Sequence, residues 1–423
     1  MLKINEIKIY IPKYPKIIID TLEKNGYEAY IVGGCVRDAL LGSVPSDYDI
    51  TTNADPQTVK KLFKRTIDTG IKHGTVTVLF YENDKPYTYE VTTFRIDGEY
   101  DDARHPKDVV FVNDLKEDLL RRDFTVNAMA YNDKVGLVDE FGGIVDLDKK
   151  IIRAVGNPVE RFTEDALRLL RAVRFAAKLG FEIEEETKNA IPKLAPSLSM
   201  VSKERVQVEL TKTICSNNPE FVKMVFDLNL SKYITDEFDS IRLGKFEKNL
   251  STYLSYTCLL YNTDIKLAYK ILKDLRLDNN NISKIMMLLE SREYYKQMVI
   301  YFNNKNLTAF DLLIKELINY LGYDLANDFV KIVRINEKFD LLQRKLAERI
   351  WSLNEEKFPI FLRDLKVDGK DMIAIGFSGQ EIGVALNSLL KIVHKNKDFN
   401  DKKLLQEIAK KAYNTYKGVP YEL

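Results

Sequence analysis

A glycine pair and two aspartates lie close together near the start of the chain. Gly33 and Gly34 follow a short apolar strand expected over 28–32, and Asp47 and Asp49 open the next expected strand. Alternate side chains of a strand share one face, so the two carboxylates should lie side by side. Such neighbours repel unless a cation such as Mg²⁺ holds both ionised. The pair predicts a metal site.

The short helix expected between the glycines and Gly42 carries Arg37 and Asp38. Glycines let a ligand approach the backbone closely, and the helix N-terminus offers free amide donors to an anion. Combined with the aspartates, this stretch predicts a site for a nucleoside triphosphate and a metal. Taken singly the signals are ambiguous, because an Asp-x-Asp pair is also typical of turns and caps on a solvated edge.

A third carboxylate is expected inside a strand over 87–94. Glu90 shares a strand face with Thr88 and Thr92. A half-buried glutamate needs a partner, and a metal shared with Asp47 and Asp49 would supply it.

Arginines gather in two later stretches. Arg122 is a candidate phosphate clamp because a guanidinium matches phosphate oxygens bidentately, although a surface salt bridge with Asp123 is an equally good reading. Further on, charged residues recur at every third position of a helix that Thr163 should cap. One half of this helix is basic with a single carboxylate, so its arginines should be available to an anionic or base-edge ligand, the alternative being a solvated face. The recurring residues are Asp165, Arg168, Arg171 and Arg174.

Helices and strands alternate up to about residue 150, which predicts an α/β unit, and long helical patterns follow. A charged segment, Arg95–Pro106, should form a surface loop. The expected helices of the first part cover 15–24, 56–65 and 115–122, and the expected strands 28–32, 75–81 and 87–94, with a strand and tight turn over 137–147. Later signals are a helix opening at 202–205, a turn at 279–281, and breaks at 358–364 and 376–379.

Composition limits the possible partners. The chain has 423 residues, with 64 Lys and Arg against 63 Asp and Glu, so affinity for nucleic acid must come from local patches. Its three cysteines are odd in number and far apart, which argues for a reducing compartment. Residues 1–10 do not resemble a signal peptide, and no apolar run reaches membrane length. We expect a soluble, cytoplasmic protein that makes no membrane contact.

Taken together, the order and spacing of these motifs resemble the class II tRNA nucleotidyltransferases, which include the bacterial CCA-adding enzymes and poly(A) polymerases. The resemblance is dense up to about residue 210 and thin beyond it. The motifs that carry it are Gly33-Gly34-x-x-Arg37-Asp38 with Asp47-x-Asp49, Arg121-Arg122-Asp123-Phe124 with Asn127-Ala128, Glu164-Asp165-x-x-Arg168-x-x-Arg171-x-x-Arg174, and Ser202-x-Glu204-Arg205 with Glu209-Leu210.

The resemblance implies a polymerase-β-like α/β nucleotidyltransferase head followed by all-α neck, body and tail domains. We expect the head over 1–150, a neck with a nucleotide-selecting helix over 151–215, a body over 216–350 and a tRNA-binding tail over 351–423. Lysines outnumber acids in the tail, which is also typical of a solvated face. Some relatives carry a metal-dependent His-Asp phosphohydrolase domain. The three scattered histidines of this chain exclude one.

The activity that the resemblance implies is template-independent addition of CCA to the 3′ end of tRNA from CTP and ATP, with Mg²⁺ as cofactor. Asp47, Asp49 and Glu90 would be catalytic metal ligands. The implied nucleotide-binding residues are Gly34, Arg37, Arg122, Asp123, Asn127, Asp165, Arg168, Arg171 and Arg174.

By the same correspondence, Asp165 and Arg168 read the base. Cytosine and adenine both offer an exocyclic amine to a carboxylate and a ring-nitrogen acceptor to a guanidinium, whereas uracil and guanine present the reverse pattern.

Several alternatives stay open. A CC-adding enzyme, an A-adding enzyme or a poly(A) polymerase would share nearly all these motifs. In the family, a loop at the position of Arg95–Pro106 helps the pocket switch from C to A, and CC-adding relatives lack it. A non-catalytic tRNA-binding protein would not need three carboxylates. A dinucleotide-binding oxidoreductase fails because the wider glycine fingerprint is missing.

Overall fold

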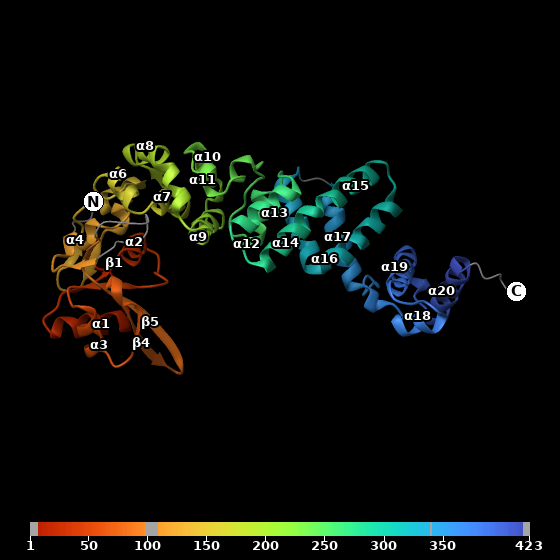
Figure 1. The fold of residues 1–423 in the computed structure, drawn as a ribbon, viewed down its shortest axis with the longest axis horizontal. Coiled ribbons are helices and arrows are strands. Elements are labelled where there is room, and N and C mark those ends of the chain that lie inside the picture. Colours follow the sequence, from red (N-terminus) through yellow and green to blue (C-terminus); the bar gives the residue numbers. More distant parts are fainter. Residues whose placement is uncertain (1–6, 98–108, 339–340, 418–423) are drawn as a thin grey trace. The chain divides into compact units, whose positions relative to one another are not determined.

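The computed structural model describes residues 7–97, 109–338 and 341–417, and it divides the chain into two compact units. The first unit comprises Met1–Ile241, Glu247–Leu250 and Lys270–Leu277, and the second comprises Arg242–Phe246, Ser251–Tyr269 and Asp278–Leu423. Figure 1 labels many of their elements.

The first unit is built on a sheet of seven strands in the order β3-β4-β5-β2-β1-β8-β9. Only the β2–β5 pair is parallel. The strands are β1 (Ala29–Val32), β2 (Asp49–Thr52), β3 (Thr66–Gly70), β4 (Thr75–Glu82), β5 (Lys85–Thr93), β8 (Ala130–Asn132) and β9 (Gly136–Val138). Two small sheets pair β6 (Arg95–Asp97) with β7 (Val109–Phe111) and β10 (Ile151–Ile152) with β11 (Glu182–Ile183).

The first helices of this unit alternate with the strands, and those from α6 onward follow the last strand of the seven-stranded sheet. Asp55 caps α3 by accepting from the backbone amides of Gln57 and Thr58, as its Asp-Pro start predicted. The helices are α1 (Lys13–Lys24), α2 (Gly34–Leu40), α3 (Pro56–Leu62), α4 (Leu115–Leu120), α5 (Gly143–Lys149), α6 (Pro158–Glu164), α7 (Leu167–Leu179), α8 (Glu185–Leu194), α9 (Lys203–Ile214), α10 (Lys223–Asp227) and α11 (Ser231–Ile234).

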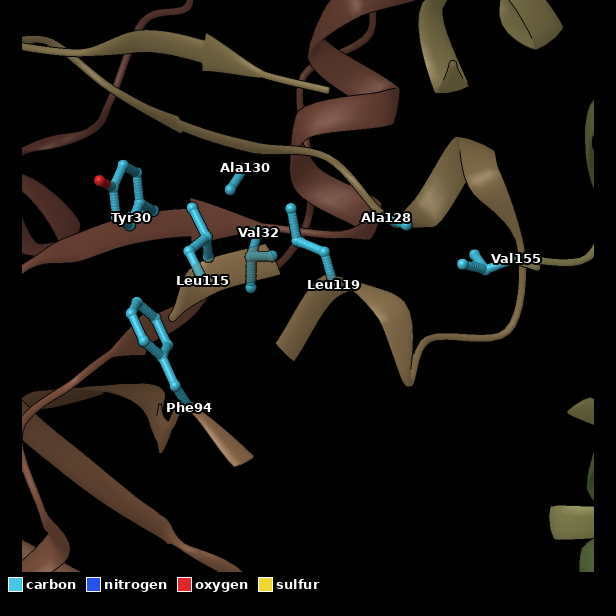
Figure 2. Close-up of a cluster of buried hydrophobic side chains, with 8 residues drawn as sticks. All are labelled: Tyr30, Val32, Phe94, Leu115, Leu119, Ala128, Ala130 and Val155. Carbon is cyan, nitrogen blue, oxygen red and sulfur yellow. The ribbon is translucent and has the colours of Figure 1, made fainter. Parts of the chain in front are cut away.

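Buried apolar side chains fix α4 against the middle of the sheet. Tyr30 and Val32 of β1 pack with Leu115 and Leu119 of α4 and with Phe94, which follows β5 (Figure 2). Burying side chains of this size contributes about 1.5–3 kcal/mol each. The cluster therefore anchors the segment that leads from α4 into residues 121–127.

The turn between β1 and α2 requires glycine. Gly33 has φ +80°, and a Cβ placed there would come within 2.9 Å of Nη1 of Arg122. A side chain at this position would thus be strained and would crowd a guanidinium. The glycine therefore allows the approach of Arg122, and the approach of a ligand to the glycine pair stays a prediction.

The described part of the second unit contains helices and no strands. Its last helices share an apolar cluster built on Val367, Met372, Leu390 and Leu405. The helices are α12 (Thr252–Leu259), α14 (Asn279–Glu290), α15 (Arg292–Asn303), α16 (Leu307–Asn336, broken at Gly322), α17 (Leu341–Glu355), α18 (Gly369–Ile375), α19 (Gln380–Lys395) and α20 (Lys402–Lys417). Helix α13 (Ile265–Asp274) runs from the second unit into the first.

Across the described residues no single helix is long and apolar enough to cross a membrane. The bent pair of α18 and α19 together reaches the length and apolar composition of a membrane span, and no other property indicates one.

The α/β part followed by helices is confirmed, but several local predictions were wrong. The segment 137–147 contains helix α5, because the Asp139 carboxylate accepts from the amides of Gly143 and Ile144 and starts a helix where glycines suggested a turn. Residues 279–281 are the first turn of α14, which Asp278 caps. Strands β3 and β8 were not predicted.

Two further corrections concern the candidate site. Arg95–Asp97 form β6, since they pair with β7, so the predicted loop is shorter; the rest of it, 98–108, lies outside the described residues. Thr163 caps no helix: it lies within α6, whose cap is Asn157.

Candidate active site

A single pocket of about 470 Å³ in the first unit collects most of the predicted site residues. Asp47 and Asp49 line it, as do all nine residues predicted to bind the nucleotide. Glu90 is not among its lining residues. Elements that are distant in sequence, from α2 to α9, therefore converge on one cavity, which the motifs alone could not show.

The carboxylates sit where β2 meets β5. Asp49 is the first residue of β2, and Asp47 lies just before the strand, not within it as predicted. The parallel register pairs Ile50 with Val91, so Asp49 and Glu90 precede neighbouring positions of adjacent strands. Burial raises the pKa of the Asp49 carboxyl; Arg122 opposes this rise, while Glu90 and Asp47 add to it. Asp49 therefore feels the negative charge of both other carboxylates.

These carboxylates suit a metal by their chemistry. Asp47, Asp49 and Glu90 form no ion pair with any residue that the structure describes, and burial is the main reason that the pKa of Asp49 is raised. Within the same ranges, no group of three or more His, Cys, Asp or Glu side chains is placed so that its members could together hold a metal ion. An open carboxylate set that relies on waters and substrate phosphates is what Mg²⁺ accepts.

Arg122 approaches the glycine turn at Gly33. The fully buried Asp118 of α4 accepts from Arg121 at 2.7 Å and Arg122 at 3.3 Å, and also from Thr51 of β2 at 3.1 Å. Because Arg122 is held by Asp118, the predicted surface salt bridge with Asp123 does not form. The buried Nε of Arg122 has no hydrogen-bond partner among the described residues, so this guanidinium keeps a donor for a ligand.

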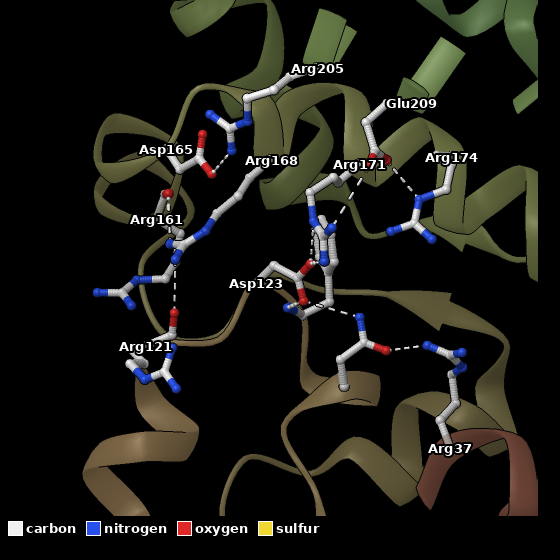
Figure 3. A network of polar contacts seen from close by, with 12 residues as sticks. Arg37, Arg121, Asp123, Arg161, Asp165, Arg168, Arg171, Arg174, Arg205 and Glu209 are labelled. Atoms are coloured by element: carbon white, nitrogen blue, oxygen red, sulfur yellow. Dashed lines mark hydrogen bonds and ion pairs between the residues drawn. The ribbon is translucent and has the colours of Figure 1, made fainter. Parts of the chain in front are cut away.

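Asp123 links the strand part of the unit to α7. Its Oδ2 accepts from Nε of Arg171 at 2.8 Å, and its Oδ1 accepts from Asn127 at 3.0 Å; Asn127 in turn accepts from Arg37 of α2 (Figure 3). Burial alone would raise the pKa of Asp123, but Arg171 and Asn127 outweigh it and hold the pKa at about 2. The carboxylate is therefore ionised at any working pH.

The arginines of α7 are paired, contrary to the prediction that they lack carboxylate partners. Arg168 donates to Glu164 at 2.6 Å, and Arg174 donates to Glu209 of α9 at 2.8 Å. With Arg171 on Asp123, each arginine of this helix has its own counter-ion. The guanidinium of Arg174 also lies 3.6 Å from the ring centre of Phe175. Packing and charge pairing thus fix these side chains before any ligand binds.

Asp165 was predicted on the same helix as these arginines, which is wrong. It ends α6 in an extended conformation, and its Oδ1 accepts from the amide of Leu167 at the start of α7. Its Oδ2 accepts from Arg205 of α9 at 2.9 Å (Figure 3). The regular spacing continued across a break, so the periodicity did not reveal it.

Sequence reasoning missed the residues that hold the site together: Asp118, Glu164, Arg205 and Glu209. Glu164, Arg205 and Glu209 belong to the quoted motifs, so the motifs carried a signal for them. Asp118 of α4 precedes the Arg-Arg pair by three and four residues, which is the spacing of a helical ion pair, although both arginines follow the end of the helix.

Comparison with known proteins agrees with this site. Residues 29–153 match the Poly A polymerase head domain, and residues 180–241 match a probable RNA and SrmB-binding site of polymerase A. A CCA-adding enzyme of Ligilactobacillus salivarius is 37% identical over 410 residues, covering 93% of this chain and 95% of the relative. The chain belongs to the CCA-adding enzyme family. The resemblance seen in the motifs is therefore confirmed, and with it the expectation of a nucleotidyltransferase.

Solved structures of CCA-adding enzymes share the fold. The Bacillus stearothermophilus enzyme in complex with CTP is 29% identical, with a TM-score of 0.77, covering 96% of this chain and all of that one. The Thermotoga maritima enzyme complexed with tRNA_CCA is 20% identical with a TM-score of 0.64, over 94% of each chain, and supports the fold alone. Nucleotidyltransferases of this kind are generally metal-dependent.

Proposed function

We propose that this protein adds CCA to the 3′ end of tRNA, using CTP and ATP without a nucleic-acid template. The observation that carries the proposal is one cavity in which unpaired carboxylates, a glycine turn with phosphate-binding arginines, and a carboxylate–guanidinium pair for base reading all meet. Family membership supports it. The tRNA 3′-hydroxyl would attack the α-phosphate of the nucleotide and release pyrophosphate.

The triphosphate would lie against the glycine turn. Backbone amides at the start of α2 and the guanidinium of Arg122, whose Nη1 lies close to Gly33, would supply donors. Arg37, held by Asp38 at 2.7 Å and by Asn127, adds a second fixed cation. These residues would hold the α-phosphate near the carboxylates and orient pyrophosphate as a leaving group.

Mg²⁺ is the cofactor we propose, held by Asp47 and Asp49, with Glu90 as the third carboxylate. Bound there, it would lower the pKa of the attacking hydroxyl and neutralise charge on the triphosphate.

Base selection would fall to Asp165 and Arg168. Each oxygen of Asp165 already accepts one hydrogen bond and can accept another from an exocyclic amine. Arg168 uses three of its five N–H groups, on Glu164 and on the carbonyls of Arg161 and Arg121, which leaves donors for a ring nitrogen. Cytosine and adenine satisfy both residues, whereas uracil and guanine would leave each facing the wrong partner.

Residues 151–215, 216–350 and 351–423 would serve as neck, body and tRNA-binding tail behind a head over 1–150. The cytoplasm is the compartment we propose, because CTP, ATP and immature tRNA meet there.

An incorporation assay tests the function. Purified protein is given tRNA ending at the discriminator base, at C, or at CC, with CTP, ATP or both, and the products are resolved by length. We expect CCA, CA and A to be added respectively, with no addition of U or G. If the protein adds only A to tRNA ending in CC, it is an A-adding enzyme. Long A tracts on unrelated RNA would identify a poly(A) polymerase.

A further inference from the structure

The β4–β5 hairpin has two faces of different character. On one face, Tyr14 of α1 stacks on Phe80 of β4, with ring centres 4.6 Å apart, and also contacts Tyr87 of β5. The acids on this side are neutralised locally, because Glu82 pairs with Lys13 and Asp68 pairs with Lys60 of α3. This face is therefore occupied by helices of the same unit.

The other face continues from the carboxylates. Glu90 pairs with Thr77, Thr88 with Leu79, and Pro86 with Tyr81. Since alternate residues share a face, Thr88 and Tyr81 lie on the side of Glu90, toward the tip of the hairpin. With their β3 neighbours they define what we call the hairpin face: Arg65, Ile67, Thr69, Leu79, Tyr81 and Thr88.

The hairpin face exposes apolar, aromatic, hydroxyl and cationic side chains to solvent. Ile67 and Tyr81 are each 50% exposed, and Thr69 and Thr88 are exposed as well. The guanidinium of Arg65 lies 4.7 Å from the ring centre of Tyr81. Arg65 precedes β3, and its carbonyl accepts from the amide of Leu79, which places it beside this face. The described β3–β5 pairs put no charged side chain on this face except Glu90. A ring stacked with a cation, beside hydroxyls, suits the bases and sugars of a single strand.

We propose that the hairpin face binds the single-stranded 3′ end of the RNA substrate and directs its terminal hydroxyl to the carboxylates. This inference rests on the proposed function. Glu90 borders the hairpin face but is not among the pocket-lining residues, so nucleotide and RNA would approach the carboxylates from different sides. Tyr81 pairs with Pro86, which lies four residues from Glu90 along β5. This separation is about 13 Å along the strand, a distance that about four stacked nucleotides would span.

The test compares Arg65→Ala/Tyr81→Ala with a matched control, Lys13→Ala/Tyr10→Ala, which also removes one cation and one exposed tyrosine. The substrate is an RNA minihelix with a single-stranded 3′ end. Loss of one stacking platform corresponds to about a tenfold to hundredfold change in affinity. We expect KM for the minihelix to rise by that factor, with CTP binding in the absence of RNA unchanged. Tyr81→Phe should keep most of the wild-type KM.

A cross-link gives a second readout. 4-Thiouridine at the third or fourth position from the 3′ end should form a photoadduct with Tyr81 in the wild type. Unchanged KM in the Arg65/Tyr81 variant and an adduct outside the hairpin face would overturn the inference, and would leave the face to a protein partner. Failure of the wild type to extend any RNA would instead overturn the proposed function.

Discussion

The two walls of the pocket carry opposite electrostatic arrangements. On the strand wall, Asp47 and Asp49 have no ion-pair partner among the described residues, and Glu90, which lies outside the pocket lining, adds negative charge near Asp49. On the helical wall, Arg168, Arg171 and Arg174 each pair with a carboxylate from elsewhere in the first unit. The carboxylates of one wall lack ion-pair partners, although the charge of Arg122 reaches Asp49, whereas the arginines of the other wall are neutralised internally.

This difference indicates separate roles. Unpaired carboxylates gain most from an added cation, so the strand wall should dominate the chemical step. Paired guanidiniums keep fixed orientations and direct individual donors, so the helical wall should govern which base is accepted and how firmly the site is held.

The largest effect should follow loss of a strand-wall carboxylate. Asp47→Ala or Asp49→Ala should lower incorporation of both C and A by about a thousandfold or more, because a metal supplies several kcal/mol of transition-state stabilisation. tRNA affinity, measured by filter binding, should stay near the wild-type value. Asp148→Ala, an exposed aspartate elsewhere in the unit, is the control. Normal turnover by either variant would show that the metal is not bound by Asp47 and Asp49.

Next in size is the switch between bases. Residues 98–108 lie outside the described structure, but the paired positions Asp97 and Val109 can be joined by an Asn-Gly turn that keeps β6 and β7 in register. This replacement should leave CC addition intact and block the terminal A, since we assign the segment to the switch from C to A. Gel analysis of products from tRNA ending at the discriminator base checks it. Full CCA addition would show that the switch lies elsewhere.

Selectivity should depend on the helical wall. Asp165→Asn with Arg168→Gln should raise incorporation of UTP and GTP relative to CTP and ATP by about tenfold or more, because mismatched hydrogen bonds cost a few kcal/mol. Arg161→Gln also removes a partner of Glu164 but lies outside the pocket lining, so it serves as the control. A double variant that is merely slower, with discrimination unchanged, would place base reading elsewhere.

The structural role of the helical wall predicts a loss of stability. Asp123→Ala leaves Arg171 without its buried partner and should cost about 3–5 kcal/mol in urea unfolding. The folded pKa of about 2 is below the unfolded value, near 3.9. The contribution of Asp123 is therefore present above about pH 4 and disappears as pH falls toward 2. A wild-type advantage over the variant that does not shrink in that range would contradict this assignment.

Prediction from sequence succeeded where chemistry is local. Gly33, Asp47 and Asp49 lie within one short stretch and line one pocket, as their spacing indicated, while their binding of phosphate and metal stays a prediction. The counter-ions of the arginines were not predictable in the same way, because Asp123 and Glu209 reach α7 from far along the chain. Periodicity also failed at Asp165, because side-chain spacing does not report a backbone break between two helices.

Binding of Mn²⁺ in the presence of CTP, followed by electron paramagnetic resonance, tests the contrast between the walls most directly. Asp49→Asn removes one strand-wall charge with little change of shape, and Glu209→Gln does the same behind the helical wall. We predict that Asp49→Asn loses Mn²⁺ binding while Glu209→Gln keeps it. Equal Mn²⁺ binding by wild type and Asp49→Asn would contradict the assignment of the metal to the unpaired carboxylates.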